Sequence, residues 1–150
     1  PSQRKRSANS KEPGERLAKV DLPRGEWVKD GLESPPARVF RPSKVNPSGL
    51  VLLNEESPVF LTLFEEWKSK VDGLHKIAVE RIVREVMYEV FVLRVADVGS
   101  LPHETGYSKD DIYEKLLSEE ALYSWPLGYV SQHAMIAPRI KAQLGIKVKL

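Results

Sequence analysis

The fold-determining stretch runs from Ser57 to Val98, opening Ser57-Pro-Val-Phe-Leu-Thr-Leu-Phe-Glu-Glu-Trp67 and closing Val90-Phe-Val-Leu-Arg-Val-Ala-Asp-Val98. Its start is typical of a helix, because Ser57 is a suitable N-cap and Pro58 at the first helical position loses no hydrogen bond. Apolar side chains then recur at helical spacing, at Phe60, Leu63, Phe64, Trp67 and Val71. We therefore expect an amphipathic helix that ends at Asp72-Gly73, with Trp67 in the core.

A second, longer helix is expected from about residue 74 to residue 96. Its apolar stripe comprises Val79, Ile82, Val83, Val86, Val90 and Leu93. Residues 86–95 are also rich in β-branched and aromatic side chains, so a strand beginning near Tyr88 is the alternative. We prefer the helix because the helical spacing continues through Leu93. Further apolar residues lie off this stripe, so the helix requires neighbours on several sides, from this chain or from a partner.

The remainder of the chain predicts shorter elements. Ser108 and Asp111 resemble a capping box that opens a helix to about Tyr123. Pro138 is expected to open a short helix that ends at Gly145. Residues 146–150 alternate strictly between apolar and polar, and could add a strand to a sheet edge in this chain or in a partner.

Charge and proline content divide the chain in two. Residues 1–49 carry 11 Lys and Arg against 6 Asp and Glu, and eight of the 11 prolines precede residue 59. Such a segment cannot bury enough apolar surface to fold alone. We predict a mainly α-helical domain of three to five helices at residues 50–150, with a possible short C-terminal strand. Residues 1–49 are expected to be an extended, proline-rich basic arm.

Composition limits the classes of function. The chain has 150 residues and no cysteine, which excludes disulfides and thiolate metal sites and fits a reducing, intracellular location. No run of 18 apolar residues is present, so we expect no transmembrane helix and no membrane partner. His75, His103 and His133 share no spacing typical of metal ligands, and no glycine-rich phosphate-binding motif occurs. We therefore expect no catalytic, cofactor or metal site, and a protein that is not an enzyme.

Basic residues are the main candidates for function. Clustered Lys and Arg displace counterions from phosphates whatever the base sequence. We assign phosphate contact to Arg4, Lys5, Arg6, Lys11, Arg38, Arg41 and Lys44. A solvated tail and a nuclear localisation signal are the alternatives for the first cluster.

Two DNA-binding architectures offer an alternative for the body. A short, a long and a short helix near residues 58–71, 74–97 and 108–123 resemble the histone fold, and Ser108-x-x-Asp111-Ile112-x-x-x-Leu116 is similar to the segment that opens that family's third helix. A helix-turn-helix interpretation instead makes residues 108–118 a supporting helix and residues 138–144 a recognition helix, with Arg139 and Lys141.

These patterns favour an interaction protein. We expect a non-enzymatic structural component of a larger intracellular assembly, either a ribonucleoprotein or a nucleoprotein shell. Its helical body would pack on other protein subunits, and its arm would lie on nucleic acid or on a neighbouring subunit. The alternative function is a DNA-binding regulator with a helix-turn-helix-like or histone-fold-like body.

Overall fold

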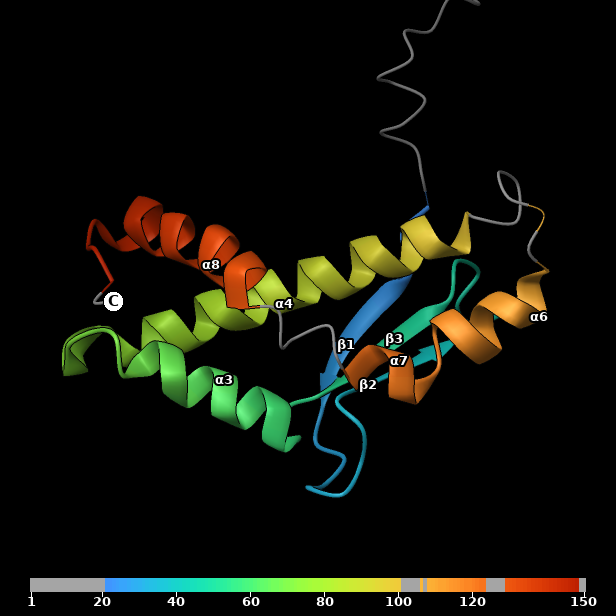
Figure 1. The fold of residues 1–150 in the computed structure, drawn as a ribbon, viewed down its shortest axis with the longest axis horizontal. Coiled ribbons are helices and arrows are strands. Elements are labelled where there is room, and N and C mark those ends of the chain that lie inside the picture. The colour runs from blue at the N-terminus through green and yellow to red at the C-terminus, as the bar shows by residue number, and fades with distance from the viewer. Residues whose placement is uncertain (1–20, 101–105, 107, 124–128, 149–150) are drawn as a thin grey trace, which may run out of the picture.

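A computed structural model of the chain describes residues 21–100, 106, 108–123 and 129–148, apart from the side chains of residues 129–132. Its elements follow the order β1 (Arg24–Val28), β2 (Ala37–Phe40), β3 (Leu50–Asn54), α3 (Pro58–Lys68), α4 (Lys76–Gly99), α6 (Lys109–Asp111), α7 (Glu119–Tyr123) and α8 (Tyr129–Leu144). Helix α4 runs along most of the molecule, with α3 and α8 toward one end and the sheet, α6 and α7 toward the other (Figure 1). Among the described residues, no helix has both the length and the apolar character needed to cross a membrane.

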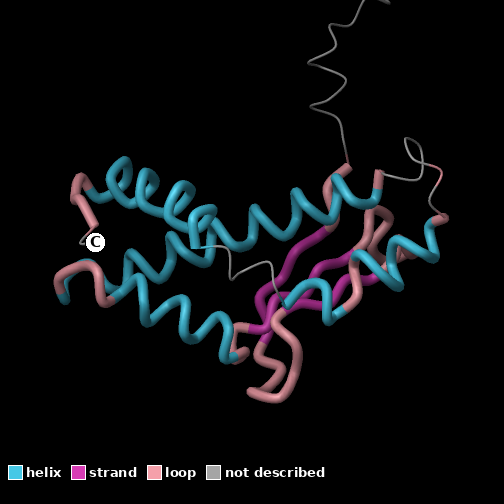
Figure 2. The backbone as a smooth tube through the Cα atoms, in the orientation of Figure 1, coloured by secondary structure: helices cyan, strands magenta, loops and turns pink. Residues whose placement is uncertain are grey.

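The three strands form one mixed sheet in the order β1-β3-β2 (Figure 2). Strand β1 pairs parallel to β3 with Arg24 beside Leu50, and β2 pairs antiparallel to β3 with Ala37 beside Leu53. The expectation of a mainly α-helical domain with an extended arm is therefore wrong, because the fold is mixed α/β and two strands come from residues 24–40. These strands are four or five residues long, and their pairing partner follows at a distance in the chain, so no local periodicity revealed them.

One face of the sheet packs on the helices. Residues that share this face by register include Trp27, Ala37 and Leu53, and the last two are fully buried. At Gly25, β1 approaches α4 so closely that a Cβ atom would lie 2.4 Å from the ring of Tyr88 and 3.0 Å from Val92. A side chain at this position would therefore force β1 away from α4.

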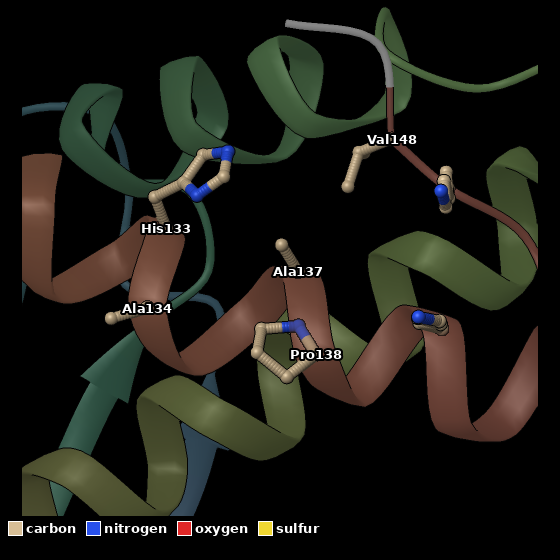
Figure 3. A pocket seen from close by; sticks show the side chains of 7 residues that line it. His133, Ala134, Ala137, Pro138 and Val148 are labelled. Carbon is tan, nitrogen blue, oxygen red and sulfur yellow. The ribbon is translucent and has the colours of Figure 1, made fainter.

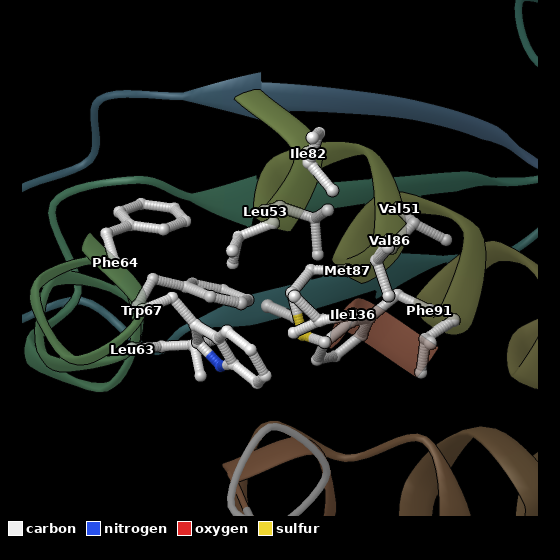
Figure 4. Packing of buried hydrophobic residues seen from close by; sticks show 14 of the residues in the cluster. Val51, Leu53, Leu63, Phe64, Trp67, Ile82, Val86, Met87, Phe91 and Ile136 are labelled. Atoms are coloured by element: carbon white, nitrogen blue, oxygen red, sulfur yellow. The ribbon is translucent and has the colours of Figure 1, made fainter. Parts of the chain in front are cut away.

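The predicted first helix is confirmed as α3, although it ends at Lys68 rather than at Asp72. Its buried residues are Phe60, Leu63, Phe64 and Trp67, as the spacing predicts. Trp67 is 1% exposed and packs in the cluster that joins α3, α4, the sheet and α8 (Figure 4). Trp27 of β1 lies edge-on to Phe60, with 5.0 Å between ring centroids, which joins the sheet to this cluster.

The second helix is confirmed as α4, and residues 86–95 are helix rather than strand. Leu93 is an error in the predicted stripe, because it is 51% exposed while Phe91, Val92 and Val95 are buried. Continuous helical geometry turns the buried face away from Leu93, and the chain itself supplies the neighbours that α4 requires, namely the sheet, α3 and α8. The apolar surface expected to meet a partner is thus largely covered within the chain.

The segments after α4 differ most from their predicted boundaries. The Ser108 side chain accepts a hydrogen bond from the Asp111 backbone N–H, so the predicted cap is present. The single helix expected after it is instead α6, a π-helical turn at Ile112–Leu116 and α7. Pro138 lies inside α8 and does not open a new helix. Residues 145–148 form no strand, and residues 149–150 lie outside the described part of the chain.

Asn54 closes the connection between β1 and β2. Its side chain is 2% exposed, accepts from the backbone N–H groups of Asp30 and Glu56 at 3.0 and 3.1 Å, and donates to the carbonyls of Gly31 and Ser34 at 2.8 and 3.3 Å. A buried amide with all these partners holds an irregular loop that has few backbone bonds of its own. Nothing in the local sequence distinguishes this asparagine from a surface one.

Asn54→Ala is expected to lower the free energy of unfolding by about 2–3 kcal/mol, because it leaves several loop groups without partners. Urea denaturation followed by tryptophan fluorescence measures the change. Asn46→Ala is the matched control, since the Asn46 side chain makes no hydrogen bond to another described residue; its expected change is below about 0.5 kcal/mol. Equal losses in the two variants would contradict the role of Asn54.

Candidate nucleic-acid interface

The residues assigned to phosphate contact fall into three groups. Arg4, Lys5, Arg6 and Lys11 lie outside the described residues. Arg38 lies on β2, whereas Arg41 and Lys44 lie on the loop between β2 and β3. Arg41 and Lys44 therefore share one loop, whereas Arg38 lies on a strand.

Arg38 is held by carboxylates of the protein itself. Its Nη2 atom lies 3.7 Å from Oδ2 of Asp30, and its Nε atom lies 3.3 Å from Oε1 of Glu119 on α7. Because a phosphate would have to compete with two carboxylates, Arg38 is a poor phosphate ligand in this arrangement. Its position indicates a structural role in holding α7 beside β2.

Arg41 is also engaged within the chain. Its guanidinium pairs with Asp110 of α6 and lies 5.0 Å from the ring centroid of Tyr113. Burial raises the pKa of the Tyr113 phenol, and the positive charge of Arg41 opposes this shift in part. Tyr113 thus remains a neutral phenol near pH 7. Sequence reasoning missed Tyr113, because only folding brings it to Arg41.

Lys44 has no carboxylate partner among the described residues. The exposed loop that carries it is internally bonded, since Ser43 N–H donates to the Asn46 carbonyl at 2.9 Å and Asn46 N–H donates to Ser43 Oγ at 3.1 Å. Gly49, with φ of +95°, returns this loop to β3. Lys44 is therefore an available cation on a defined loop.

A shallow hollow of about 330 Å³ lies beside this loop. Its lining comprises Asp21, Pro23, Pro42, Pro47, Ser48, Val95, Ala96, Gly99, Ser100 and Tyr113. Asp21 is the first described residue, so the basic segment 1–20 joins the body here, at the end where α4 finishes (Figure 1). Residues 1–20 carry six Lys and Arg against two Glu. We call Asp21, the 41–49 loop and Tyr113 the entry end.

Within the described residues, the other candidates form no second site. No group of three His, Asp or Glu side chains within the described part of the chain could hold a metal ion. His133 packs against the ring of Trp67 at 5.7 Å between centroids, and His103 lies outside the described residues. Arg139, proposed for a recognition helix, makes two hydrogen bonds to Glu89 of α4 at 2.9 and 2.7 Å, so the body itself uses this guanidinium.

Comparisons with known proteins found no match to this chain. Models of protein families, curated proteins and solved structures were searched.

Proposed function

We propose that the protein is a non-enzymatic structural component of a larger intracellular nucleoprotein assembly, with the basic segment and the entry end lying on nucleic-acid phosphates. The observation that carries the proposal is the junction at Asp21. Here the segment with the densest positive charge joins the body, and Asp21 lines one hollow with Pro42 and Pro47 of the 41–49 loop. This loop also carries Lys44, a cation without a carboxylate partner among the described residues. Two segments that are distant in sequence can therefore follow one phosphate backbone.

The character of this end favours phosphate contact over base reading. The 41–49 loop is not a helix that could enter a groove, and it carries prolines and a single lysine without a carboxylate partner among the described residues. Lys and Arg contacts to phosphates position a protein on nucleic acid without reading its sequence. This supports a structural component over a sequence-reading regulator.

Exposed apolar residues at the opposite end support contact with protein subunits. Leu74 lies in the turn between α3 and α4, Ile77 lies in the first turn of α4, and they are 96% and 86% exposed. Two nearly fully exposed aliphatic side chains at one turn are suited to burial against another subunit. The body would thus bind protein at this turn and nucleic acid at the entry end.

The triple variant Arg4→Ala, Lys5→Ala, Arg6→Ala is expected to weaken binding of duplex DNA about equally for all sequences. The slope of log K against log salt should fall by about 3, near 0.9 for each lost phosphate contact. Lys44→Ala should lower it by about 1 for the same reason. Fluorescence titration of a labelled duplex from low to physiological salt measures both slopes.

Arg38→Ala is the matched control, because the Arg38 guanidinium is already paired with Asp30 and Glu119. Its slope should equal that of the unchanged protein. An unchanged slope in the triple variant would contradict phosphate binding by the basic segment and leave a role in protein contact. A loss confined to one preferred sequence would indicate a DNA-binding regulator instead.

A further inference from the structure

An apolar slot lies between α8 and the segment that follows it. Its volume is about 490 Å³, within the range of sites that hold a ligand or an anchoring side chain. Its lining comprises His133, Ala134, Ala137, Pro138, Lys141, Lys147 and Val148. The labelled residues of α8 lie along one wall and Val148 lies across from them (Figure 3). The walls are mainly aliphatic, so the slot suits an apolar group.

Both charged residues of the lining are lysines. Lys141 and Lys147 are exposed, and no carboxylate of a described residue lies within ion-pair distance of either one. By contrast, Arg84 of α4 pairs with Glu55, and Arg139 of α8 pairs with Glu89. The slot thus combines an apolar floor with positive charge that the described body leaves uncompensated.

The backbone beside the slot makes few hydrogen bonds to other described residues. Gly145, with φ of +67°, ends α8 by donating its N–H to the Lys141 carbonyl at 2.9 Å. Residues 146–148 then make no backbone hydrogen bond to another described residue, although Ile146 and Val148 pack against the core. Pro138 lacks an N–H, so the Ala134 carbonyl receives no hydrogen bond from it. Backbone groups without a partner in the described part of the chain can bind an extended peptide.

We propose that this slot binds an extended acidic peptide segment of another protein, with one apolar side chain between α8 and Val148 and flanking carboxylates on Lys141 and Lys147. Charge complementarity selects the acidic residues, and the apolar lining selects the anchor. The backbone at residues 146–148, which makes no hydrogen bond to another described residue, favours an extended peptide over a small molecule. The slot would give the proposed function a second protein contact in addition to the one at Leu74 and Ile77, and it is separate from the entry end.

Fluorescence polarisation with a fluorescein-labelled peptide Asp-Glu-Leu-Glu-Asp tests the proposal on the full chain without nucleic acid. The full chain should bind this peptide saturably. Replacing the central Leu by Gly should weaken binding about tenfold, the value expected for one buried aliphatic side chain. Replacing the four acidic residues by Gln should weaken binding by a similar factor.

Two variants locate the binding site. Lys141→Glu with Lys147→Glu should weaken binding of the acidic peptide at least about tenfold by replacing attraction with repulsion. Ala134→Trp should also weaken it, because the new indole at this exposed position would occupy the slot. The control is Arg81→Glu with Lys109→Glu, which changes the net charge equally at exposed positions outside the slot and should leave affinity unchanged. Circular dichroism spectra check that every variant is folded.

Several outcomes would overturn the proposal. Equal loss in the slot and control variants would mean general charge attraction, and no saturable binding below about 1 mM would exclude the peptide. Saturable binding of dodecanoate in place of the peptide would assign the slot to a fatty acid. Self-association that Ala134→Trp abolishes would assign it to a second copy of the chain. Because no nucleic acid is present, failure here would leave the salt-dependence test of the entry end unaffected.

Discussion

Removing residues 1–48 is expected to abolish the cooperative thermal unfolding of this protein. The deletion removes β1 and β2, so β3 loses both hydrogen-bonded neighbours. It also removes Trp27 and the fully buried Ala37, which uncovers Val51 and Leu53. A single strand cannot satisfy its own backbone groups, and the exposed apolar face favours aggregation. Calorimetry of the purified fragment, with circular dichroism, measures the loss.

Deletion of residues 1–20 is the matched control, because it leaves the sheet and every contact between described residues in place. Its melting temperature should lie within a few degrees of that of the full chain, as a small change in free energy implies. If the fragment without residues 1–48 still unfolds cooperatively near the melting temperature of the full chain, the helices fold without β1 and β2. Such a result would contradict the contribution of the sheet to the core.

Trp67→Ala is expected to lower the free energy of unfolding by about 3–5 kcal/mol, the range for truncation of a buried aromatic residue. Trp67 is 1% exposed, and its ring contacts His133 of α8, so the change leaves a cavity where α3 and α8 meet. Urea denaturation followed by far-ultraviolet circular dichroism measures the loss, since the substitution removes a fluorophore.

Leu61→Ala, on the same helix, is the control for helix propensity and for loss of apolar surface. Leu61 is 41% exposed, so its truncation should cost less than about 1 kcal/mol. If Trp67→Ala lowers the free energy of unfolding by less than about 1 kcal/mol, the Trp67 side chain faces solvent or a partner rather than the core. Comparable losses for the two variants would show that the α3 stripe does not distinguish core from surface.

Local sequence alone determined the two central helices. The spacing of Phe60, Phe64 and Trp67 sets one face of α3 at 3.6 residues per turn, and the same period identifies α4 despite its β-branched content. Helical hydrogen bonds join residues four apart, so the pattern and the structure that it indicates occupy the same short stretch. The C-terminal cap at Gly145 follows from equally local chemistry.

Contacts between residues distant in sequence decided which strands form the sheet and which charged residues form ion pairs. Gly25 and Trp27 acquire a role only where β1 lies beside β3 and against α4, and Asn54 only where the β1–β2 loop folds over it. The sequence assigned Arg38 and Arg41 to phosphate contact and Arg139 to a recognition helix. In the structure Arg38 pairs with Glu119, Arg41 with Asp110 and Arg139 with Glu89. Strand pairing and ion pairing depend on separation in space, which residue types and local spacing do not specify. Tertiary structure therefore decided which basic residues the body uses and which, like Lys44 and Lys141, it leaves without a carboxylate partner among the described residues.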